Sequence, residues 1–515
     1  MSVFRNTGVV GSMTLISRVL GFVREILLAT VFGAKGGMDA FLVALMIPNF
    51  GRRMFAEGAF SQAFVPVFTA TKTTGTHAQA RDLVAVVMGT LGGFLSIVTL
   101  LGCLAAPVLV WLFASGFATD PVKSALGAEL LRWTFPYLMF ISLTSLAGGV
   151  LNAYGRFAVP AFTPVILNVC MIATMYIDSS SVQVLAYAVF AAGILQFVFQ
   201  LPSLKLLDLL PWPRWAWGDE RVRRIVGLMI PVLIGSSVAQ VSLLLNTNLS
   251  TYLGDGRVSW LYYANRLMEF PLGIFSIAMG TAILPALSAH HATRSSERFS
   301  ATLDGSLRAL LIIGLPAAAG LILLAGPLVA TVYGHGRFTA DDVHMTTYAL
   351  WAYGVGFIGF SLVRVLVPGF YARHEMKLPV RFAIISLIIG MTMSLALFAV
   401  HRFVQFQAAH VVLAASTSLT ACVNAALLFR RLRRDGIYSA EPGWGVFALR
   451  VGAATAAMSA VVLVFAGPLP QWLALDALQR GVRILCVILG AAGAYAGVLL
   501  ALGVRFKHLR TRFPL

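Results

Sequence analysis

The chain has 515 residues, of which 59% are hydrophobic and only 11% are charged, with a mean hydropathy of +0.85. Soluble domains carry about a quarter charged residues, so this composition excludes a soluble enzyme and indicates a chain whose main solvent is lipid. The formal charge of +18 raises the question of nucleic-acid binding. The four cysteines show no CxxC or Cys/His ligand spacing, so we predict neither a disulfide framework nor a zinc site.

Apolar segments of about 20 or more residues, the length that spans a bilayer, recur along the whole chain. The first is interpreted as a retained helix, because it lacks a compact apolar core followed by a small-residue cleavage site. We place about fourteen such segments, near 6–33, 38–71, 80–113, 126–151, 158–178, 182–203, 222–252, 258–289, 299–326, 342–372, 379–400, 408–429, 443–467 and 480–504. The predicted fold is an all-α polytopic membrane protein.

The basic residues between these segments predict the orientation of the chain. Alternate gaps hold about 22 lysines and arginines, and the intervening gaps hold about 7. Positive residues are retained on the cytoplasmic side, so both termini are predicted to be cytoplasmic. The charge of +18 is thereby explained by topology, and no nucleic-acid partner is predicted.

Two proline pairs indicate an internal repeat. Pro66 and Pro285 are 219 residues apart (285 − 66), as are Pro160 and Pro379 (379 − 160). Six apolar segments fit in that interval, so we predict two six-helix lobes, 1–205 and 206–435, followed by an additional helix pair with a basic tail at 436–515. Parallel repeats of this kind usually hold a binding site between the halves, near the middle of the membrane.

Arginine is unexpectedly frequent inside the predicted spans. A charge at the bilayer centre costs roughly 2.5–3.5 kcal/mol, so such residues are functional candidates. At 1.5 Å per residue, Arg18 and Arg52 lie about 20 Å from the ends of their segments, near the midplane. The full set is Arg18, Arg24, Arg52, Arg53, Arg132, Arg266, Arg308, Arg364 and Arg450.

A structural role competes with a functional one for each of these arginines. Arg24 and Arg266 could form ion pairs that lock helices together. Arg450 lies near the cytoplasmic edge, where its side chain can reach water. Two further arginines have a carboxylate one turn away on the same helix face, Arg53 with Glu57 and Arg308 with Asp304. For Arg132 and Arg364, both a structural and a functional role stay open.

The chemistry of the deep charges favours an anionic substrate. Guanidinium stays protonated in a poor solvent and binds phosphate or carboxylate in a bidentate fork. Deep acids are few and mostly have arginine neighbours: Glu25, Asp39, Glu57 and Glu269. GxSxG, HExxH and Walker sequences are absent, so the chain is predicted not to be an enzyme and to use no metal or cofactor.

Several runs closely resemble the MurJ (MviN) family of bacterial lipid II flippases. The resemblance covers essentially the whole chain. The runs that carry it are SRVLGFVRE (17–25), MDAFLVALMIPNFGRRMFAEGAFSQAFVP (38–66), YYANRLMEFPLGIFSIAMGTAILP (262–285) and PGFYAR (368–373).

The resemblance implies a fold of the multidrug/oligosaccharidyl-lipid/polysaccharide exporter type, with two six-helix lobes in a V and a C-terminal helix pair that forms a groove for a polyprenyl tail. It implies movement of an undecaprenyl-diphosphate-linked disaccharide-pentapeptide from the inner to the outer leaflet of the bacterial cytoplasmic membrane, by alternating access. The family's cavity arginines match Arg18, Arg24, Arg52 and Arg266. Its acidic outer-gate residue matches Asp39, and Glu57 falls in the matching motif.

The resulting hypothesis assigns the four cavity arginines to the diphosphate, with Arg53, Glu57, Glu25 and Glu269 as gate or supporting residues beside Asp39. The partners are then lipid II and membrane lipids, with cell-wall synthesis enzymes as further candidates. Two alternatives stay open. One is a multidrug or small-cation antiporter of the same fold, and the other is a membrane scaffold for cell-wall enzymes.

Overall fold

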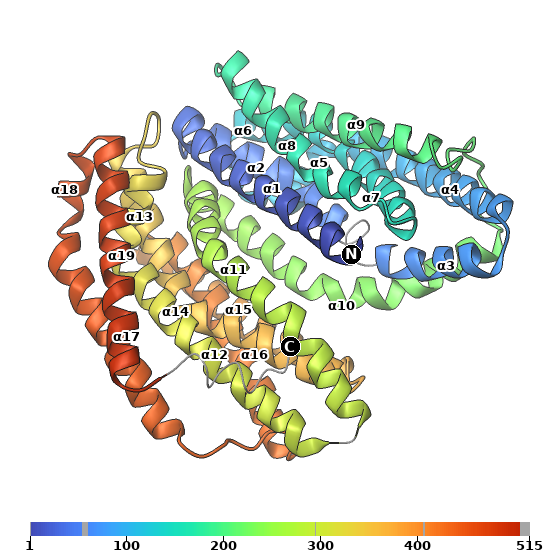
Figure 1. The fold of residues 1–515 in the computed structure, drawn as a ribbon. Helices are drawn as coiled ribbons and strands as arrows, with labels where there is room; N and C mark the ends of the chain where they lie inside the picture. The colour runs from blue at the N-terminus through green and yellow to red at the C-terminus, as the bar shows by residue number, and fades with distance from the viewer. Residues whose placement is uncertain (1, 54–59, 294, 405–406, 505–515) are drawn as a thin grey trace. The chain divides into compact units, whose positions relative to one another are not determined.

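The computed structural model describes residues 2–53, 60–293, 295–404 and 407–504, and all regular structure in these ranges is helical. Figure 1 shows the helices in chain order. Their contacts divide the chain into two compact units, Met1–Ser259 and Trp260–Leu515. The division falls in the first turn of α11 (Arg257–Ala292). An all-helical fold is what the sequence predicted.

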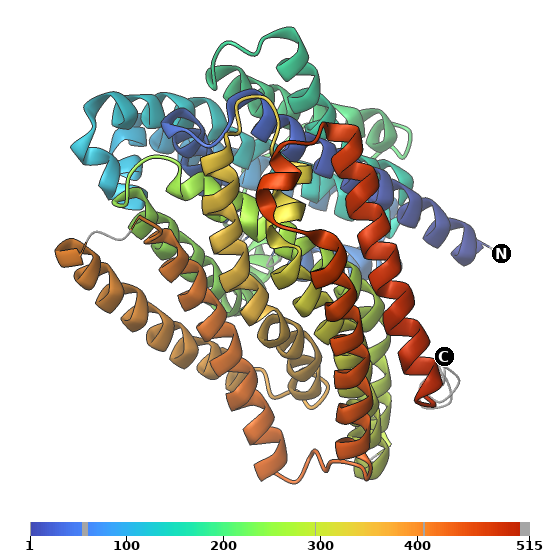
Figure 2. The ribbon, with the colours of Figure 1, turned by 90° about the vertical axis from the view of Figure 1, so that its left-hand side faces the viewer.

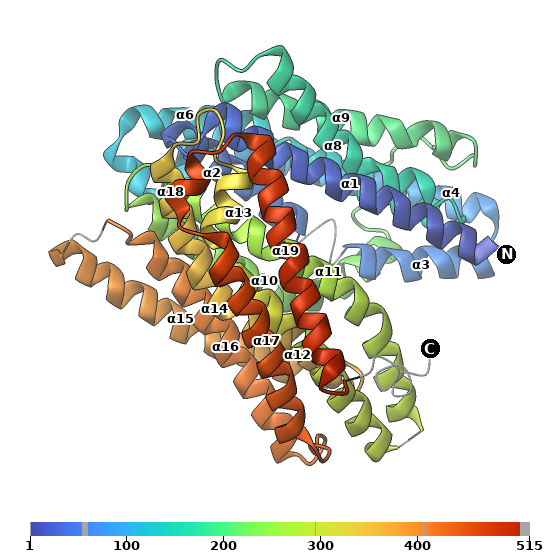
Figure 3. The ribbon, with the colours of Figure 1, turned by 60° about the vertical axis from the view of Figure 1, so that its left-hand side comes forward.

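Unit 1 is built from ten α-helices and a short 3-10 turn within the described residues. Figure 3 shows α1, α8 and α9 running side by side. The helices are α1 (Ser2–Phe32), α2 (Gly36–Gly51), α3 (Phe60–Thr74), α4 (His77–Leu104), α5 (Ala106–Phe113), α6 (Pro121–Thr134), α7 (Tyr137–Ala153), α8 (Ala158–Ile177), α9 (Gln183–Lys205) and α10 (Glu220–Thr251), with η2 (Ser115–Thr119) between α5 and α6.

The core of unit 1 contains an aromatic stack on α3. Phe60, Phe64 and Phe68 recur every four residues and therefore share one helix face. Their ring centroids are 5.2 Å and 5.4 Å apart, and all three side chains are buried. The face packs against apolar residues of α4 and α7, which fixes α3 within the unit.

Unit 2 begins with α11 and contains the final helix pair. Figure 2 shows α17 and α19 side by side, drawn in red. The helices are α11, α12 (Ser296–Leu323), α13 (Ala325–Val332), α14 (Ala340–Tyr371), α15 (Lys377–Val404), α16 (His410–Arg434), α17 (Trp444–Ala466), α18 (Leu469–Leu473) and α19 (Ala477–Ala501).

Helix α14 lies at the centre of unit 2, packed against α12 and α16. Glycines permit the close approach of α16. A Cβ at Gly356 would lie 2.4 Å from Cβ of Ser418, and one at Gly359 would lie 2.8 Å from the backbone nitrogen of Cys422. Small residues at helix contacts are the usual means of close packing in membranes.

Ten segments within the described residues are long and apolar enough to cross a membrane. They are His77–Leu104, Pro121–Ala153, Ala158–Ile177, Gln183–Lys205, Ser296–Leu323, Ala340–Tyr371, Lys377–His401, His410–Arg434, Trp444–Ala466 and Ala477–Ala501. Helices α1, α10 and α11 have 31, 32 and 36 residues. They are long enough to span but are not among the ten, so the count of fourteen stays a prediction.

Some predicted spans are interrupted, within the described residues, where the sequence analysis expected one continuous helix. The segment expected at 80–113 is divided at Ala105, and the one expected at 126–151 is divided at Pro136. Proline provides no N–H for the helical ladder and clashes with the preceding turn. Pro136 has this effect directly, and Pro107 occupies the first turn of α5, where proline is tolerated.

Candidate functional site

The two deep arginines of α1 differ in their surroundings. Arg18 is exposed and, among the described residues, forms no hydrogen bond or ion pair. Arg24 donates to Oδ1 of Asn168 at 2.9 Å, and Nδ2 of Asn168 donates to the carbonyl of Ser17 at 3.0 Å. Asn168, on α8, therefore fixes the Arg24 guanidinium and leaves Arg18 available to a ligand.

Arg24 also forms an ion pair with Glu25, the next residue of α1. Glu25 is buried, with 5% of its surface exposed. A buried carboxylate needs a cation or donors to offset its desolvation, so the structural role considered for Arg24 is present. The ion pair uses only part of the hydrogen-bonding capacity of Arg24, because a guanidinium has five N–H donors.

Arg52 and Arg53 follow α2 at a short π-helical turn, and both are half-buried. Nε of Arg52 donates back to Oδ1 of Asn49 at 3.0 Å. Nη1 of Arg53 donates to Oε1 of Gln240 on α10, at 3.3 Å. The two neighbouring arginines therefore reach in different directions. Glu57, the proposed partner of Arg53, lies outside the described residues.

In unit 2, Arg266 and Glu269 lie one turn apart on α11 and form an ion pair of 2.9 Å. The second carboxylate oxygen of Glu269 accepts from Asn265 at 3.1 Å. The Arg266 guanidinium also lies over the ring of Tyr262, 4.9 Å from its centroid. The Arg266 side chain remains 35% exposed, so it is held in position while still accessible to an anion.

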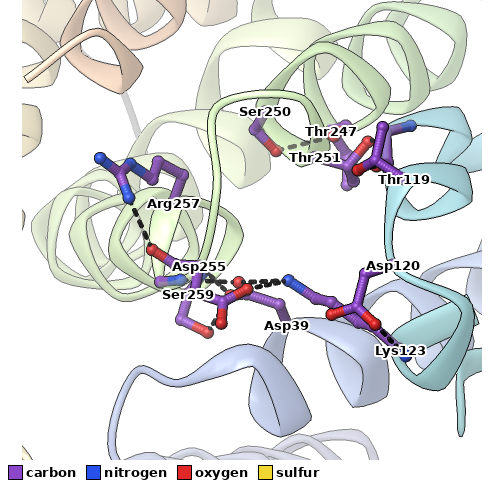
Figure 4. A network of polar contacts seen from close by, with 12 residues as sticks. Asp39, Thr119, Asp120, Lys123, Thr247, Ser250, Thr251, Asp255, Arg257 and Ser259 are labelled. Atoms are coloured by element: carbon purple, nitrogen blue, oxygen red, sulfur yellow. Dashed lines mark hydrogen bonds and ion pairs between the residues drawn. The ribbon is translucent and has the colours of Figure 1, made fainter. Parts of the chain in front are cut away.

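Asp39 forms a densely hydrogen-bonded, buried polar site in unit 1 (Figure 4). Its side chain is fully buried. It accepts from the backbone nitrogens of Gly256 and Ser259 at 2.7 Å and 2.9 Å, and from Oγ of Ser259 at 2.6 Å. These donors belong to the first turn of α11 and the residue before it. A carboxylate is stabilised there by unpaired backbone N–H groups and by the positive end of the helix dipole.

Lys123 connects a second carboxylate to this site. Its Nζ lies 3.4 Å from Asp39 and 2.6 Å from Asp255, and 4.4 Å from the ring centroid of Phe117. Only 8% of the Lys123 surface is exposed. The lysine on α6 thus fastens α2 to the turn that precedes α11. We define the outer latch as Asp39, Lys123, Asp255, Gly256 and Ser259.

The sequence analysis included Asp39 among the gate residues but missed the other members of the outer latch. Asp39 and Lys123 are 84 residues apart, and no local pattern relates them. The only available signal was a lysine at the start of an apolar segment, which is common next to membranes.

The remaining deep arginine with a predicted ion pair is Arg308. It contacts Asp304 at 2.8 Å, one turn earlier on α12, as predicted. Asp304 is fully buried and also accepts from Tyr438 at 2.8 Å and from Trp444 at 2.7 Å. This cluster ties α12 to the segment that leads into α17, so its role is structural.

The candidate arginines are described separately in each unit: Arg18, Arg24 and Arg52 in unit 1, and Arg266 in unit 2. A guanidinium can bind an oxyanion with two parallel N–H donors. Arg24 and Arg266 have a carboxylate neighbour that orients them, while Arg18 has none among the described residues. No group of three or more histidine, cysteine or acidic side chains in the described ranges could hold a metal ion.

Known proteins match this chain over nearly its full length. The family described as lipid II flippase MurJ matches residues 28–482. A probable lipid II flippase MurJ of Haemophilus influenzae is 40% identical over 97% of this chain and 100% of its own length. A lipid II flippase MurJ of Burkholderia cenocepacia is also 40% identical, over 99% of this chain and 100% of its own.

Solved structures show the same fold. One of a lipid II flippase MurJ in an inward closed conformation has a TM-score of 0.78 at 22% identity, covering 97% of this chain and 99% of that one. An inward-facing multidrug resistance MATE family transporter of the MOP superfamily has a TM-score of 0.65 at 14% identity, covering 83% and 98%. From the family match and the identity to these relatives, the chain belongs to the lipid II flippase MurJ family.

Proposed function

We propose that this protein is a lipid II flippase. It moves undecaprenyl-diphosphate-linked disaccharide-pentapeptide from the inner to the outer leaflet for peptidoglycan synthesis. The observation that carries the proposal is family membership, with relatives of this name 40% identical over essentially the whole chain. The arginine-rich interior agrees with it, because the diphosphate of this lipid is an anion that must cross a poor solvent.

Arg18, Arg24, Arg52 and Arg266 bind the diphosphate in this proposal. Guanidinium is suited to the task because its planar donors match two phosphate oxygens at once. The exposure of Arg18 and the partial exposure of Arg266 support the assignment. Arg53 is assigned a supporting role, because it bonds Gln240 across to another helix. Glu25 and Glu269 orient their arginine neighbours.

The outer latch is proposed to close the outer side of the transport path. Asp39 of α2 accepts three hydrogen bonds from Gly256 and Ser259, at the start of α11, and forms an ion pair with Lys123 of α6. Release of these contacts would free the start of α11 from α2 and α6. Alternating access requires such a contact set, formed in one state and broken in the other.

The two six-helix lobes and the final pair retain their proposed roles. Residues 1–205 and 206–435 form the lobes, and the pair in 436–515 holds the polyprenyl tail in lipid. The close packing of α17 on α19 supports a pair that acts as one element. The chain is a multi-pass membrane protein, and we place it in the bacterial cytoplasmic membrane with both termini in the cytoplasm, as the distribution of basic residues predicts.

Depletion of the protein tests the proposal. The gene is placed under a repressible promoter, and lipid II is then measured in each leaflet by its accessibility to an impermeant enzyme that degrades it. We expect lipid II to accumulate in the inner leaflet. An unchanged distribution, or a loss of lipid II synthesis instead of its export, would contradict the flippase assignment and favour a scaffolding role.

A further inference from the structure

Asn168 is a buried polar side chain in the middle of α8, a helix that is apolar enough to span the membrane. Only 5% of its surface is exposed. A buried amide costs free energy unless its oxygen and its nitrogen are both hydrogen-bonded. An apolar residue of similar volume would pack α8 against its neighbours without this cost. The amide therefore needs an explanation beyond helix packing, and its hydrogen bonds supply one.

Both ends of the Asn168 amide are bonded to α1, which runs beside α8 (Figure 3). Oδ1 accepts from Nη1 of Arg24 at 2.9 Å, and Nδ2 donates to the carbonyl oxygen of Ser17 at 3.0 Å. These partners determine the orientation of the amide, because a guanidinium only donates and a backbone carbonyl only accepts. Rotating the amide by half a turn would lose both bonds. Asn168 is therefore fixed by α1, and it fixes Arg24 in turn.

The contact points of Asn168 on α1 lie on one face of that helix. Ser17, Gly21 and Arg24 are spaced at i, i+4 and i+7, so the second and third lie within about 40° of the first around the helix. A Cβ at Gly21 would lie 3.7 Å from Nδ2 and 3.8 Å from Oδ1 of Asn168. This is van der Waals contact, so a side chain larger than that of alanine would displace the amide. The sequence of α1 thus leaves a space at Gly21 that fits one amide.

Arg24 is held from a second side by Glu25, which forms an ion pair with Nη2. One terminal nitrogen of the guanidinium therefore contacts a neutral amide from α8, and the other contacts a carboxylate from α1. Each terminal nitrogen carries two hydrogens, and these two bonds use one hydrogen on each. Two anchors prevent rotation of the planar group, while 16% of the side chain stays exposed. A donor group that is fixed before binding loses less entropy when an oxyanion binds.

The neutral charge of Asn168 suits this role. Arg24 and Glu25 together have a net charge of zero, so an aspartate at position 168 would give the group a net charge of −1, which repels a phosphate. An aspartate would also place a carboxylate oxygen opposite the carbonyl of Ser17, where a donor is needed. Asparagine orients the arginine without adding negative charge to the site.

We propose that Asn168 is a positioning residue for recognition of the substrate, which acts through Arg24 by holding its guanidinium in the orientation that binds the diphosphate. The inference rests on the proposed flippase function, in which Arg24 binds this group. A positioning residue and a packing residue differ in their dependence on Arg24. A positioning residue changes the affinity for lipid II only while Arg24 is present, whereas a packing residue has the same effect with or without it.

The test is a double-mutant cycle on lipid II binding to the purified full-length protein in nanodiscs, measured by native mass spectrometry. Asn168→Ala is expected to weaken binding about tenfold, the equivalent of one hydrogen bond to a charged group. Asn168→Asp is expected to weaken binding further, because it adds a negative charge beside Arg24. In an Arg24→Ala background, Asn168→Ala should have no further effect, since the residue through which it acts is gone.

The matched control is Gln196→Ala. Gln196 on α9 is also buried, with 1% of its surface exposed, and its Nε2 donates to the carbonyl oxygen of Thr163 on α8 at 2.9 Å. This variant loses a buried amide-to-carbonyl bond but, among the described residues, no bond to an arginine. Its melting temperature should therefore fall like that of Asn168→Ala, while its affinity for lipid II stays at the wild-type value.

Three results would overturn the inference: wild-type affinity in Asn168→Ala, equal weakening by Asn168→Ala with and without Arg24, or equal weakening by Gln196→Ala. Should Asn168→Ala fail to fold, wild-type affinity in Asn168→Asp, which keeps the shape of the side chain, would overturn it. Failure of the wild-type protein to bind lipid II would instead overturn the proposed function.

Discussion

Arginine has two contrasting environments in this membrane protein, and the partners of each side chain separate them. Arg480 on α19 is only 8% exposed and donates to four carbonyl oxygens. These are the oxygens of Trp472 at 2.8 Å, Leu473 at 3.0 Å, Ala330 at 3.0 Å and Gly334 at 2.6 Å. Backbone carbonyl oxygens thus surround the Arg480 guanidinium, whereas Arg18 is exposed and has no such partners among the described residues. The first pattern is typical of a stabilising residue, and the second agrees with the proposed binding role of Arg18.

Replacement of Arg480 should therefore destabilise the protein without a specific effect on substrate binding. Arg480→Met removes donors from four carbonyls in a region with little water, at a cost of about 3 kcal/mol or more. We expect the apparent melting temperature in detergent to fall by several degrees. The control is Arg483→Met, because Arg483 is less buried and bonds a single backbone carbonyl, that of Ala466 at 2.9 Å, besides the side-chain oxygen of Gln471 at 3.2 Å. Equal losses in the two variants would contradict the interpretation.

Replacement of Arg18 should have the opposite result. Arg18→Ala removes a side chain that has no partner among the described residues, so the melting temperature should change by less than the Arg480 variant changes it. Export of lipid II should fall at least tenfold if the guanidinium binds phosphate. Growth of a depleted strain supplied with the variant, at matched levels of folded protein, measures this. Normal growth would show that Arg18 does not bind the diphosphate.

At the scale of helices, the sequence predicted the position of regular spans better than their interruptions. The segments expected at 158–178 and 182–203 are observed as Ala158–Ile177 and Gln183–Lys205. Hydropathy finds such helices because each is flanked by polar turns. The break at Pro136 was not predicted, because proline is tolerated within membrane helices when neighbours satisfy the freed backbone groups.

The capping of α10 is a local feature with a pH-dependent consequence. Asp219 precedes the helix and accepts from Arg221 through three hydrogen bonds, of 2.9 Å, 3.0 Å and 2.6 Å. These bonds to Arg221 lower the pKa of the Asp219 carboxyl to about 2. The folded-state pKa lies below the unfolded value of 3.8, so the cap stabilises the protein fully above about pH 4 and loses this effect as the pH falls toward 2.

We therefore expect the melting temperature of the wild-type protein to fall more steeply between pH 4 and pH 2 than that of Asp219→Asn. The difference corresponds to about 2 kcal/mol at most, since the pair is partly accessible to water. Thermal unfolding in detergent at a series of pH values measures it. Parallel curves for the two proteins would mean that Asp219 does not contribute to acid sensitivity.

The outer latch joins α2 and α6 to the turn before α11, and a reversible cross-link tests its role. A Cβ at Gly36 would lie 3.1 Å from Cγ of Asp255, so the two Cβ atoms are no more than about 4.6 Å apart, close to the 3.5–4.5 Å of a disulfide. Gly36→Cys with Asp255→Cys, in a background without the four native cysteines, should stop export when oxidised and recover on reduction. Each single variant is the control. Continued export in the cross-linked protein would contradict a gating role.

For the whole molecule, composition was sufficient to predict a helical membrane protein, and arginine content to predict an anionic substrate. The contacts between the candidate site residues could not be predicted from the sequence, because they join residues that are far apart in the chain. Asn168 lies 144 residues from Arg24, and Lys123 lies 84 residues from Asp39. Charged neighbours within one turn were found correctly, as for Arg308 and Asp304, since helix geometry alone brings them together.

The charge of the substrate should make export sensitive to the membrane potential. Each elementary charge that crosses the membrane changes the free energy by about 2.3 kcal/mol per 100 mV. Outward movement of two phosphate charges is favoured when the inside is negative, and any movement of the cavity arginines with them offsets part of this. In proteoliposomes with an imposed potassium diffusion potential, flipping of lipid II should accelerate with an inside-negative potential and slow when the potential is abolished. A rate independent of potential would mean that the arginine charges move with the phosphates and cancel them, so that the potential could not drive export.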